Sequence, residues 1–560
     1  MGLVAYEVFT GQHPFDRGDD SQLVASLLGR EPDWQPLHQH PRLVSLLRCL
    51  LAKSPAARPS ADEALTRLLE AVDIPSPQET AALRESTLQA ARFVGREEPL
   101  ALLRAAMDQA RAGAGGLWLL GGESGVGKSR LMEELRVHCL VQGGLSVRGQ
   151  AVSEGGVSYA LWLEILRTLC LGTELDALDA SVLKSILPDL DALLDRAIPE
   201  APALHPQAAQ LRLINVIESL LLRQTQPLLL LLEDLQWSDA ESLAILRRLA
   251  PSCRTRPLLI VASYRHDECP ELPNDLPGCP VLKLARLSTA GIAELCKSML
   301  GGDACTPELV AFLETETEGN VFFIIEVMRA LAEEAGQLSL IAAHRLPKQV
   351  LTGGIQAIVQ RRLARLPEEA LPLLRLAAVA GRQLDLAVLR RFEEKLQSWL
   401  YLAANAAVLE VSDQVWRFAH DKIRESLLLE LSPAATRQLH LLVADALAAT
   451  YPGSAPHAAA LAEHYQRGGS PDKAAFYLVE AGVHALSQGA TEAASALLKQ
   501  ALAPAARALL SRTQAARAHN GLIQAKLALG RVAGDDRGQH LDVGGAVEVF
   551  ADLAEQRADR

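Results

Sequence analysis

One stretch of this 560-residue chain has the residue types and the spacing of a phosphate-binding loop. Residues 122–129 read GESGVGKS and satisfy the pattern G-x-x-x-x-G-K-[ST]. Glycines let the backbone aim successive N–H groups at phosphate oxygens, and the start of the following helix adds partial positive charge. Lys128 would reach the β- and γ-phosphates, and the Ser129 hydroxyl would bind Mg²⁺. The predicted nucleotide contacts here are Gly122, Gly125, Val126, Gly127, Lys128, Ser129 and Arg130.

Two carboxylates and one arginine follow other apolar segments and could complete a catalytic site. Glu233 and Asp234 come directly after residues 228–232, and Arg265 follows residues 258–262. Ligands bind at the carboxyl ends of strands in open α/β sheets, where one acid can hold the Mg²⁺ shell while its neighbour orients the attacking water. Adjacent strand residues point to opposite faces, so we expect the two acids to differ in role. The predicted catalytic residues are Glu233, Asp234 and Arg265, and the predicted Mg²⁺ ligands are Ser129, Glu233 and Asp234.

The elements that must position these residues are short strands alternating with helices. Four segments are apolar along their length, with Ser146 as the one polar exception, as strands buried on both faces of a parallel sheet must be: 117–120, 145–147, 228–232 and 258–262. Residues 129–141 form a helical pattern directly after the loop. Such alternation predicts right-handed crossovers and an open α/β sheet. After about Leu284 the strand signals fade, and helical patterns run almost unbroken to Leu529.

Composition favours a folded, helix-rich protein with several domains. Apolar residues make up 49% and charged residues 22%, while aromatics are only 4%. A net charge of −12 argues against a nucleic-acid-binding surface as the main function. The eight cysteines include no C-x-x-C pair, which predicts reduced thiols in the cytoplasm. The longest strongly apolar run falls far short of the ~20 residues of a membrane span, so we expect a soluble, cytoplasmic protein.

Taken together, these motifs resemble those of the signal-transduction ATPases with numerous domains, in the subgroup often attached to serine/threonine kinases and transcription activators. The resemblance covers about residues 92–502. It rests on FVGRE at 93–97, EDLQWSD at 233–239, SYR at 263–265 and GNVFF at 319–323, where the family usually has proline in place of Val321. It implies ATP or ADP with Mg²⁺ as cofactors, and it adds Val94, Gly95 and Arg96 to the nucleotide contacts.

The same resemblance extends into the second half of the chain. Residues 346–389 are similar to a small helical segment that leads into a winged-helix domain. FAHDxxR at 418–424 resembles the segment whose histidine touches the β-phosphate of ADP in the closed state, which assigns that role to His420; a histidine packed beside Phe418 is the alternative. Residues 461–502 look like a pair of tetratricopeptide-type helices, which would bind a partner protein or a small-molecule effector.

The first 70 residues resemble the end of the large lobe of a protein kinase. GLVxYEVxTGxxPF at 2–15 and LAKxPxxRPS at 51–60 carry this likeness. The stretch has no Gly-rich loop, strand lysine, catalytic-loop aspartate or D-F-G metal ligand, and phosphoryl transfer by a kinase needs all of them. We therefore expect no kinase activity. Ser60 is the predicted N-cap of the helix over 61–72, with Glu63 completing a capping box.

The predicted function is a nucleotide-dependent switch that is closed with ADP, open with ATP and reset by slow Mg²⁺-dependent hydrolysis. Three alternatives stay open: a fast ATPase that does mechanical work, a scaffold that binds nucleotide only for stability, and a truncated gene product. The predicted order is a kinase-lobe fragment (1–72), a linker (73–91), a P-loop ATPase domain (92–284), a helical lid (285–345), a winged-helix-like helical domain (346–450), tetratricopeptide-like helices (451–530) and a poorly ordered tail (531–560).

Overall fold

The computed structural model divides into two compact units, Met1–Arg84 and Glu85–Arg560. It describes residues 2–15, 30–54, 57–59, 61–72, 93–152, 158–300, 305–335, 341, 354–412 and 415–530. The predicted linker at 73–91, the predicted N-cap Ser60 and the predicted tail at 531–560 lie outside the described residues.

The first unit is a small cluster of helices. Tyr6, Leu43 and Leu47 are buried at its centre, whereas Val4 and Val8 are exposed. Its resemblance to the end of a kinase lobe stays a prediction. The elements are α1 (Gly2–Thr10), η1 (Gln35–Leu37), α3 (Pro41–Leu50) and α4 (Ala61–Val72).

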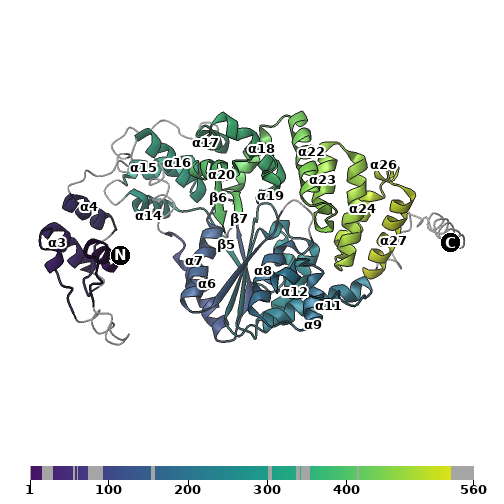
Figure 1. Cartoon of the computed structure of the whole chain (residues 1–560), viewed down its shortest axis with the longest axis horizontal. Helices are drawn as coiled ribbons and strands as arrows, with labels where there is room; N and C mark the ends of the chain where they lie inside the picture. Colours follow the sequence, from purple (N-terminus) through teal and green to yellow (C-terminus); the bar gives the residue numbers. More distant parts are fainter. Residues whose placement is uncertain are drawn as a thin grey trace. The chain divides into compact units, whose positions relative to one another are not determined.

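The second unit is built on a five-stranded parallel sheet (Figure 1). The strand order is β2-β3-β4-β1-β5, and every neighbouring pair is parallel. The predicted open α/β sheet and its first four strands are therefore confirmed. The fifth strand was not predicted, because it has only four residues at an edge of the sheet, one of them Lys283. The strands are β1 (Gly116–Gly122), β2 (Leu145–Gln150), β3 (Leu228–Glu233), β4 (Leu258–Tyr264) and β5 (Val281–Leu284).

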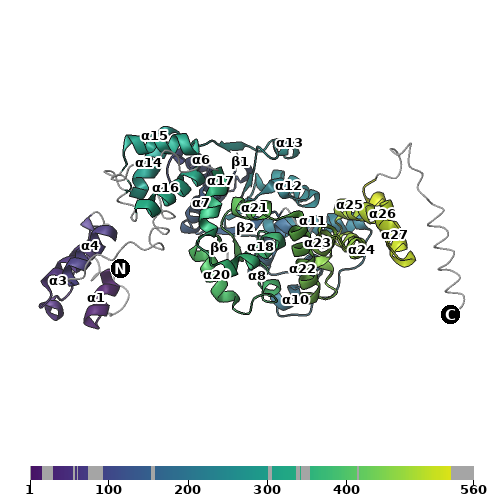
Figure 2. The ribbon, with the colours of Figure 1, turned by 90° about the horizontal axis from the view of Figure 1, so that it is seen from above.

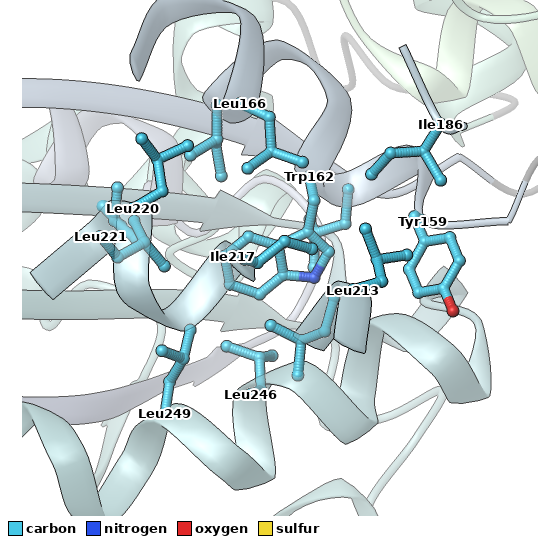
Figure 3. Packing of buried hydrophobic residues seen from close by; sticks show 14 of the residues in the cluster. Tyr159, Trp162, Leu166, Ile186, Leu213, Ile217, Leu220, Leu221, Leu246 and Leu249 are labelled. Atoms are coloured by element: carbon cyan, nitrogen blue, oxygen red, sulfur yellow. The ribbon is translucent and has the colours of Figure 1, made fainter. Parts of the chain in front are cut away.

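Helices cover both faces of this sheet, α6 and α7 on one and α8, α11 and α12 on the other (Figure 1). Side chains of β3 alternate between the two layers, since Leu229 and Leu231 pack with α6 and α7 while Leu230 packs in the opposite cluster. Figure 3 shows that opposite cluster, in which Trp162 lies among leucine and isoleucine side chains. The helices are α6 (Glu97–Arg111), α7 (Lys128–Val141), α8 (Ala160–Gly172), α9 (Ala177–Lys184), α10 (Leu190–Leu193), α11 (Pro206–Leu222) and α12 (Ala240–Cys253).

The prediction that all four strands are buried on both faces is wrong for β2. This strand lies at the edge of the sheet, and only Val147 and Gly149 of its six residues are buried. An edge strand has a neighbour on one side only, which leaves room for half-buried polar side chains such as Arg148.

The segment after the sheet consists of two groups of helices, each with its own apolar cluster. The hairpin β6–β7 interrupts the second group, so the prediction of almost unbroken helices to Leu529 is wrong at this point. The first group is α14 (Thr289–Leu300), α15 (Pro307–Thr317) and α16 (Val321–Ala335). The second is α17 (Gly354–Leu363), α18 (Leu371–Ala380), α19 (Leu386–Leu389), α20 (Leu396–Asn405), β6 (Leu409–Ser412), β7 (Val415–Phe418), α21 (Asp421–Leu429) and α22 (Pro433–Thr450).

The last helices lie side by side in a row that follows α22 (Figures 1 and 2). They pack closely because small residues line the contacts: a Cβ on Gly482 would lie 2.5 Å from Leu498 Cγ. A helical C-terminal region is therefore confirmed, and its tetratricopeptide character stays a prediction. The helices are α23 (Ala458–Gly468), α24 (Pro471–Ser487), α25 (Thr491–Ala501), α26 (Pro504–Arg507) and α27 (Arg512–Ala528).

The row of helices is tied to the sheet layer by a buried carboxylate. Glu241 Oε1, on α12, accepts hydrogen bonds from the backbone N–H groups of Glu492 (2.9 Å) and Ala493 (3.0 Å) at the start of α25. A carboxylate is favourable at a helix N-terminus, although burial raises the pKa of Glu241 above its ordinary value. In the described part of the chain, no helix combines the length and the apolar character needed to cross a bilayer.

Replacing Glu241 tests this tie. Glu241→Ala leaves two partly buried N–H groups without their acceptor and should lower the free energy of unfolding by about 1–3 kcal/mol. Glu241→Gln keeps an acceptor oxygen and removes a buried charge, so it should stay close to wild type. Thermal or urea unfolding of the three proteins measures this difference, and equal losses in both variants would contradict the role given to the acceptor oxygen.

Candidate nucleotide site

The loop between β1 and α7 has a backbone that favours glycine at two positions. Gly125 and Gly127 have φ angles of 83° and 102°, in the left-handed region that side chains disfavour. A Cβ on Gly125 would also lie 2.8 Å from both Asn320 Oδ1 and Phe322 Cβ. These two glycines therefore set the course of the loop and its close approach to α16.

The loop presents a set of free N–H groups. Within the described residues, no acceptor takes a hydrogen bond from the backbone N–H of Gly125, Gly127, Lys128 or Ser129. These groups stand at the N-terminus of the 14-residue helix α7, where the helix dipole favours negative charge. Such a cradle fits the phosphates of a nucleotide.

Lys128 is buried and bonds to the loop itself. Its Nζ donates to the carbonyl oxygens of Gly122 (2.8 Å) and Glu123 (2.9 Å). Burial lowers the pKa of Lys128 to about 8, against a smaller opposing effect of Asp234. The ammonium group is thus held beside the loop. The oxygens of a bound phosphate would provide a negative partner for it.

Glu233 lies against the loop on the α7 side of the sheet. Its Oε2 accepts a hydrogen bond from Ser129 Oγ at 2.8 Å. Its Oε1 is 3.3 Å from Arg148 Nε but accepts no hydrogen bond within the described part of the chain, although the side chain is only 4% exposed. Mg²⁺ prefers oxygen ligands such as these. Ser129 and Glu233 would therefore hold the cation, and Glu233 has a buried acceptor atom available for its water shell.

Asp234 has different partners, because the chain turns at this residue. It adopts a left-handed φ of 60°, and its Oδ2 accepts hydrogen bonds from Gln150 (2.9 Å) and Arg382 (2.6 Å). Burial alone would raise the pKa of Asp234, but Arg382 and the side-chain amides of Gln150 and Gln236 together hold it below its ordinary value. A role as Mg²⁺ ligand would require Arg382 to withdraw.

Arg265 likewise faces the C-terminal half of the chain. It donates to Glu268 Oε1 at 2.6 Å and to Asp421, and its guanidinium lies 4.9 Å from the centre of the Trp237 ring. Its backbone N–H donates to Gln236 Oε1 at 3.1 Å, which fixes the end of β4. At 3% exposure, this arginine is fully engaged with its neighbours.

His420 reaches the loop through one aromatic side chain. Its ring stacks on Phe322 with centroids 3.9 Å apart, and the Phe322 N–H donates to the Gly125 carbonyl at 3.1 Å. His420 Nδ1 accepts the N–H of Lys422 at 3.2 Å, as the N-cap of α21. Burial lowers the pKa of His420 to about 3, with Arg362 and Arg382 adding repulsion, so the ring is neutral near pH 7.

The segment before α6 braces the loop from the other side. Arg96 Nη2 donates to the carbonyl oxygens of Val126 (3.3 Å) and Ala285, and Val94 packs against the apolar cluster of α14–α16. Gly95 has a φ of 66°. Arg130, another predicted nucleotide contact, pairs with Glu134 on α7 at 3.0 Å.

Four further residues contact the predicted site but were given no role from the sequence. Asn320 Nδ2 donates to the Ser124 carbonyl at 3.0 Å, and the GNVFF motif already pointed to it. Asp421 lies in the FAHD motif. Arg148 and Arg382 had no sequence signal, because the acids that they contact at the site, Glu233 and Asp234, lie far away along the chain, 148 residues away in the case of Arg382.

The fold and these contacts define a P-loop nucleoside triphosphatase domain. Residues 92–261 match the family model described as an AAA ATPase domain. This part of the chain is therefore similar to AAA ATPase domains, as the motifs predicted. No curated protein sequence matches the chain.

Several solved structures are similar in fold. One is a signal transduction ATPase with numerous domains with a tetratricopeptide repeat sensor from Pyrococcus horikoshii, at 15% identity over 84% of this chain and 65% of that one, with a TM-score of 0.39. Another is Cdc6p from Pyrobaculum aerophilum, at 12% identity over 62% and 99% of the two chains, with a TM-score of 0.31. This chain spans just under two thirds of the length of the Pyrococcus protein.

The low pKa of His420 makes a prediction about acid stability. The folded state keeps the ring neutral, whereas the unfolded chain protonates it near the ordinary value of about 6.5, so stability should be lost as the pH falls below 6.5. Between pH 7 and pH 5, His420→Gln should lose about 1–2 kcal/mol less unfolding free energy than wild type. Denaturant unfolding at both pH values measures this, and parallel losses in the two proteins would contradict it.

Proposed function

We propose that this chain is an ATP-dependent signalling switch with slow Mg²⁺-dependent hydrolysis, and that the arrangement described above is its closed state. The observation that carries the proposal is a row of four alternating charges. Asp234 and Arg265 come from the ends of β3 and β4, and Arg382 and Asp421 come from the C-terminal half of the chain. We call these four residues the latch.

The latch connects its members in series. Arg382 Nη1 lies 2.6 Å from Asp234 Oδ2, and Arg382 Nε lies 3.0 Å from Asp421 Oδ1. Arg265 bonds the other oxygen of Asp421. None of the four side chains is more than 18% exposed. Removing one partner from such a buried set typically costs about 3–5 kcal/mol, so the latch is strong enough to hold one conformation.

The latch also removes two predicted catalytic groups from the reaction. In this state Asp234 is committed to Arg382, and Arg265 is committed to Asp421. Hydrolysis needs both groups at the γ-phosphate, so the closed arrangement would hydrolyse slowly at most. A γ-phosphate and its Mg²⁺ would compete with the latch for these side chains, which gives ATP the preference for the open state that a switch requires. A shift from 1:99 to 99:1 needs about 5.5 kcal/mol of such preference.

A second set of contacts would report the nucleotide to the C-terminal half. Asn320 and Phe322 bond to the carbonyl oxygens of the loop, and Phe322 stacks on His420. A phosphate in the cradle would therefore act on α16 and α21 together. We assign to His420 the contact with bound ADP that the family resemblance implies.

When bound, Mg²⁺ would offset the charge of the phosphates and orient the water ligands around them. Ser129 and Glu233 would hold the cation, and Lys128 would grip the phosphates. After the latch opens, Asp234 would orient the attacking water, and Arg265 would stabilise charge on the transferred group. The helices α23–α27 would bind the partner protein or effector that shifts the balance between the two states.

Nucleotide analysis of the purified protein tests the proposal. Wild type should retain ADP, and Lys128→Ala should lose most of it, since a charge-assisted hydrogen bond of about 1.5–3 kcal/mol corresponds to a roughly tenfold to hundredfold weaker complex. Chromatography of the nucleotide released by denaturation measures the content. Arg167→Ala, which removes a half-exposed ion pair on α8, is the matched control. Wild type without ADP, and without affinity for added ADP, would overturn the proposal.

Opening the latch should speed nucleotide exchange. Arg382→Gln and Asp421→Asn each leave buried charge uncompensated in the closed state, so ADP release should be at least about tenfold faster than in wild type. Release of a fluorescent ADP analogue after mixing with excess ADP gives the rate. Arg417→Gln removes an ion pair with Glu410 within the hairpin and should leave the rate unchanged. Slower or unchanged exchange in both latch variants would argue for a nucleotide-stabilised scaffold.

A further inference from the structure

The acid that faces the phosphate loop already has a cationic neighbour. Arg148, on the edge strand β2, places its Nε 3.3 Å from Glu233 Oε1 and donates from Nη2 to Glu133 Oε2 at 2.9 Å. Its side chain is 18% exposed, against 4% for Glu233. Arg148 thus lies between two carboxylates, one at the strand end and one on α7.

The two oxygens of Glu233 divide between Ser129 and Arg148. Oε2 accepts the Ser129 hydroxyl, while Oε1 faces Arg148 without a well-aligned hydrogen bond in the described chain. A buried carboxylate needs a positive counter-charge. The same carboxylate would accept hydrogen bonds from the water shell of a Mg²⁺ bound at Ser129. Arg148 and Mg²⁺ would therefore compete for Glu233.

The neighbouring contacts would let Arg148 change partners without losing charge compensation. Glu133 lies one helical turn after Ser129 on α7, and it also pairs with Arg136 at 2.8 Å. If a metal takes over Glu233, Arg148 can remain bonded to Glu133. The guanidinium then needs only to give up the 3.3 Å contact, not to leave the site.

On the basis of the proposed function, we propose that Arg148 is a positioning residue. Its guanidinium is the positive partner of Glu233 in the place that Mg²⁺ would otherwise take. Arg148 and the metal compete for this carboxylate, so Arg148 sets the Mg²⁺ concentration at which the nucleotide complex takes up its metal. Arg148 keeps Glu233 oriented toward Ser129 when no metal is bound. It also makes metal entry depend on the pairing of Glu133.

A Mg²⁺ titration of the full chain with a fluorescent ADP analogue bound tests this inference without measuring activity. Arg148→Gln should lower the Mg²⁺ concentration for half-saturation about tenfold, because the competing charge is gone. Arg148→Lys should lie close to wild type. Glu133→Gln should raise the midpoint, since Arg148 then loses the carboxylate that would hold it when a metal takes over Glu233. Arg417→Gln, which removes an ion pair within the hairpin, is the control and should leave the midpoint unchanged.

Opposite shifts in Arg148→Gln and Glu133→Gln are not expected from a general loss of structure, which would weaken both. The inference is overturned if the analogue binds but Arg148→Gln leaves the Mg²⁺ midpoint unchanged or raises it. Should Arg148→Gln fold poorly, an unchanged or lowered midpoint in Glu133→Gln overturns it equally. Failure of every variant and of wild type to bind the analogue would instead reject the proposed function, and this inference with it.

Discussion

A buried carboxylate must find a positive partner, and Asp234 finds one 148 residues further along the chain. Its bond to Arg382 joins the end of β3 to the segment after α18, and the ion pairs of Arg382 and Arg265 with Asp421 extend the junction to the start of α21. The backbone makes the geometry firm, because the Arg382 carbonyl accepts the Phe418 N–H beside the hairpin. The arrangement of the C-terminal half against the nucleotide site depends on this junction.

The two adjacent acids illustrate how one strand end can serve two parts of the molecule. Glu233 continues the alternation of β3 and faces α7, where Ser129 donates to it. Asp234 leaves the strand with a positive φ, and its N–H lies 3.3 Å from Ser263 Oγ on the next strand. One acid therefore belongs to the phosphate loop, and the other belongs to the contact with the C-terminal half. Glu233 and Asp234 are neighbours in the chain, so an exchange of nucleotide at Glu233 would take place one peptide bond away from the contact that Asp234 makes.

Local patterns in the sequence were enough for the loop, the first four strands and the open parallel sheet, because glycine spacing and apolar runs are properties of neighbouring residues. The short edge strand β5 and the hairpin β6–β7 escaped notice, since four-residue strands carry too few apolar positions to stand out. Arg148 and Arg382 could not be found in this way. Their roles depend on acids that only the folded structure brings close to them. In the sequence alone, an arginine that pairs with a distant acid looks the same as an arginine on the surface.

The helices at the end of the chain share the hydrophobic core of the sheet layer. Ala485, Ala490 and Ala525 belong to the same buried cluster as Trp162 and Ile217. Domain limits drawn from motifs therefore do not coincide with the limits of the packed core. A fragment that stops after α22 would expose apolar side chains on α11 and α12, the helices that contact α27 and α25. The region that would bind an effector and the region that would bind nucleotide share one buried cluster, so a ligand that displaces the helical row would also disturb the packing on that face of the sheet.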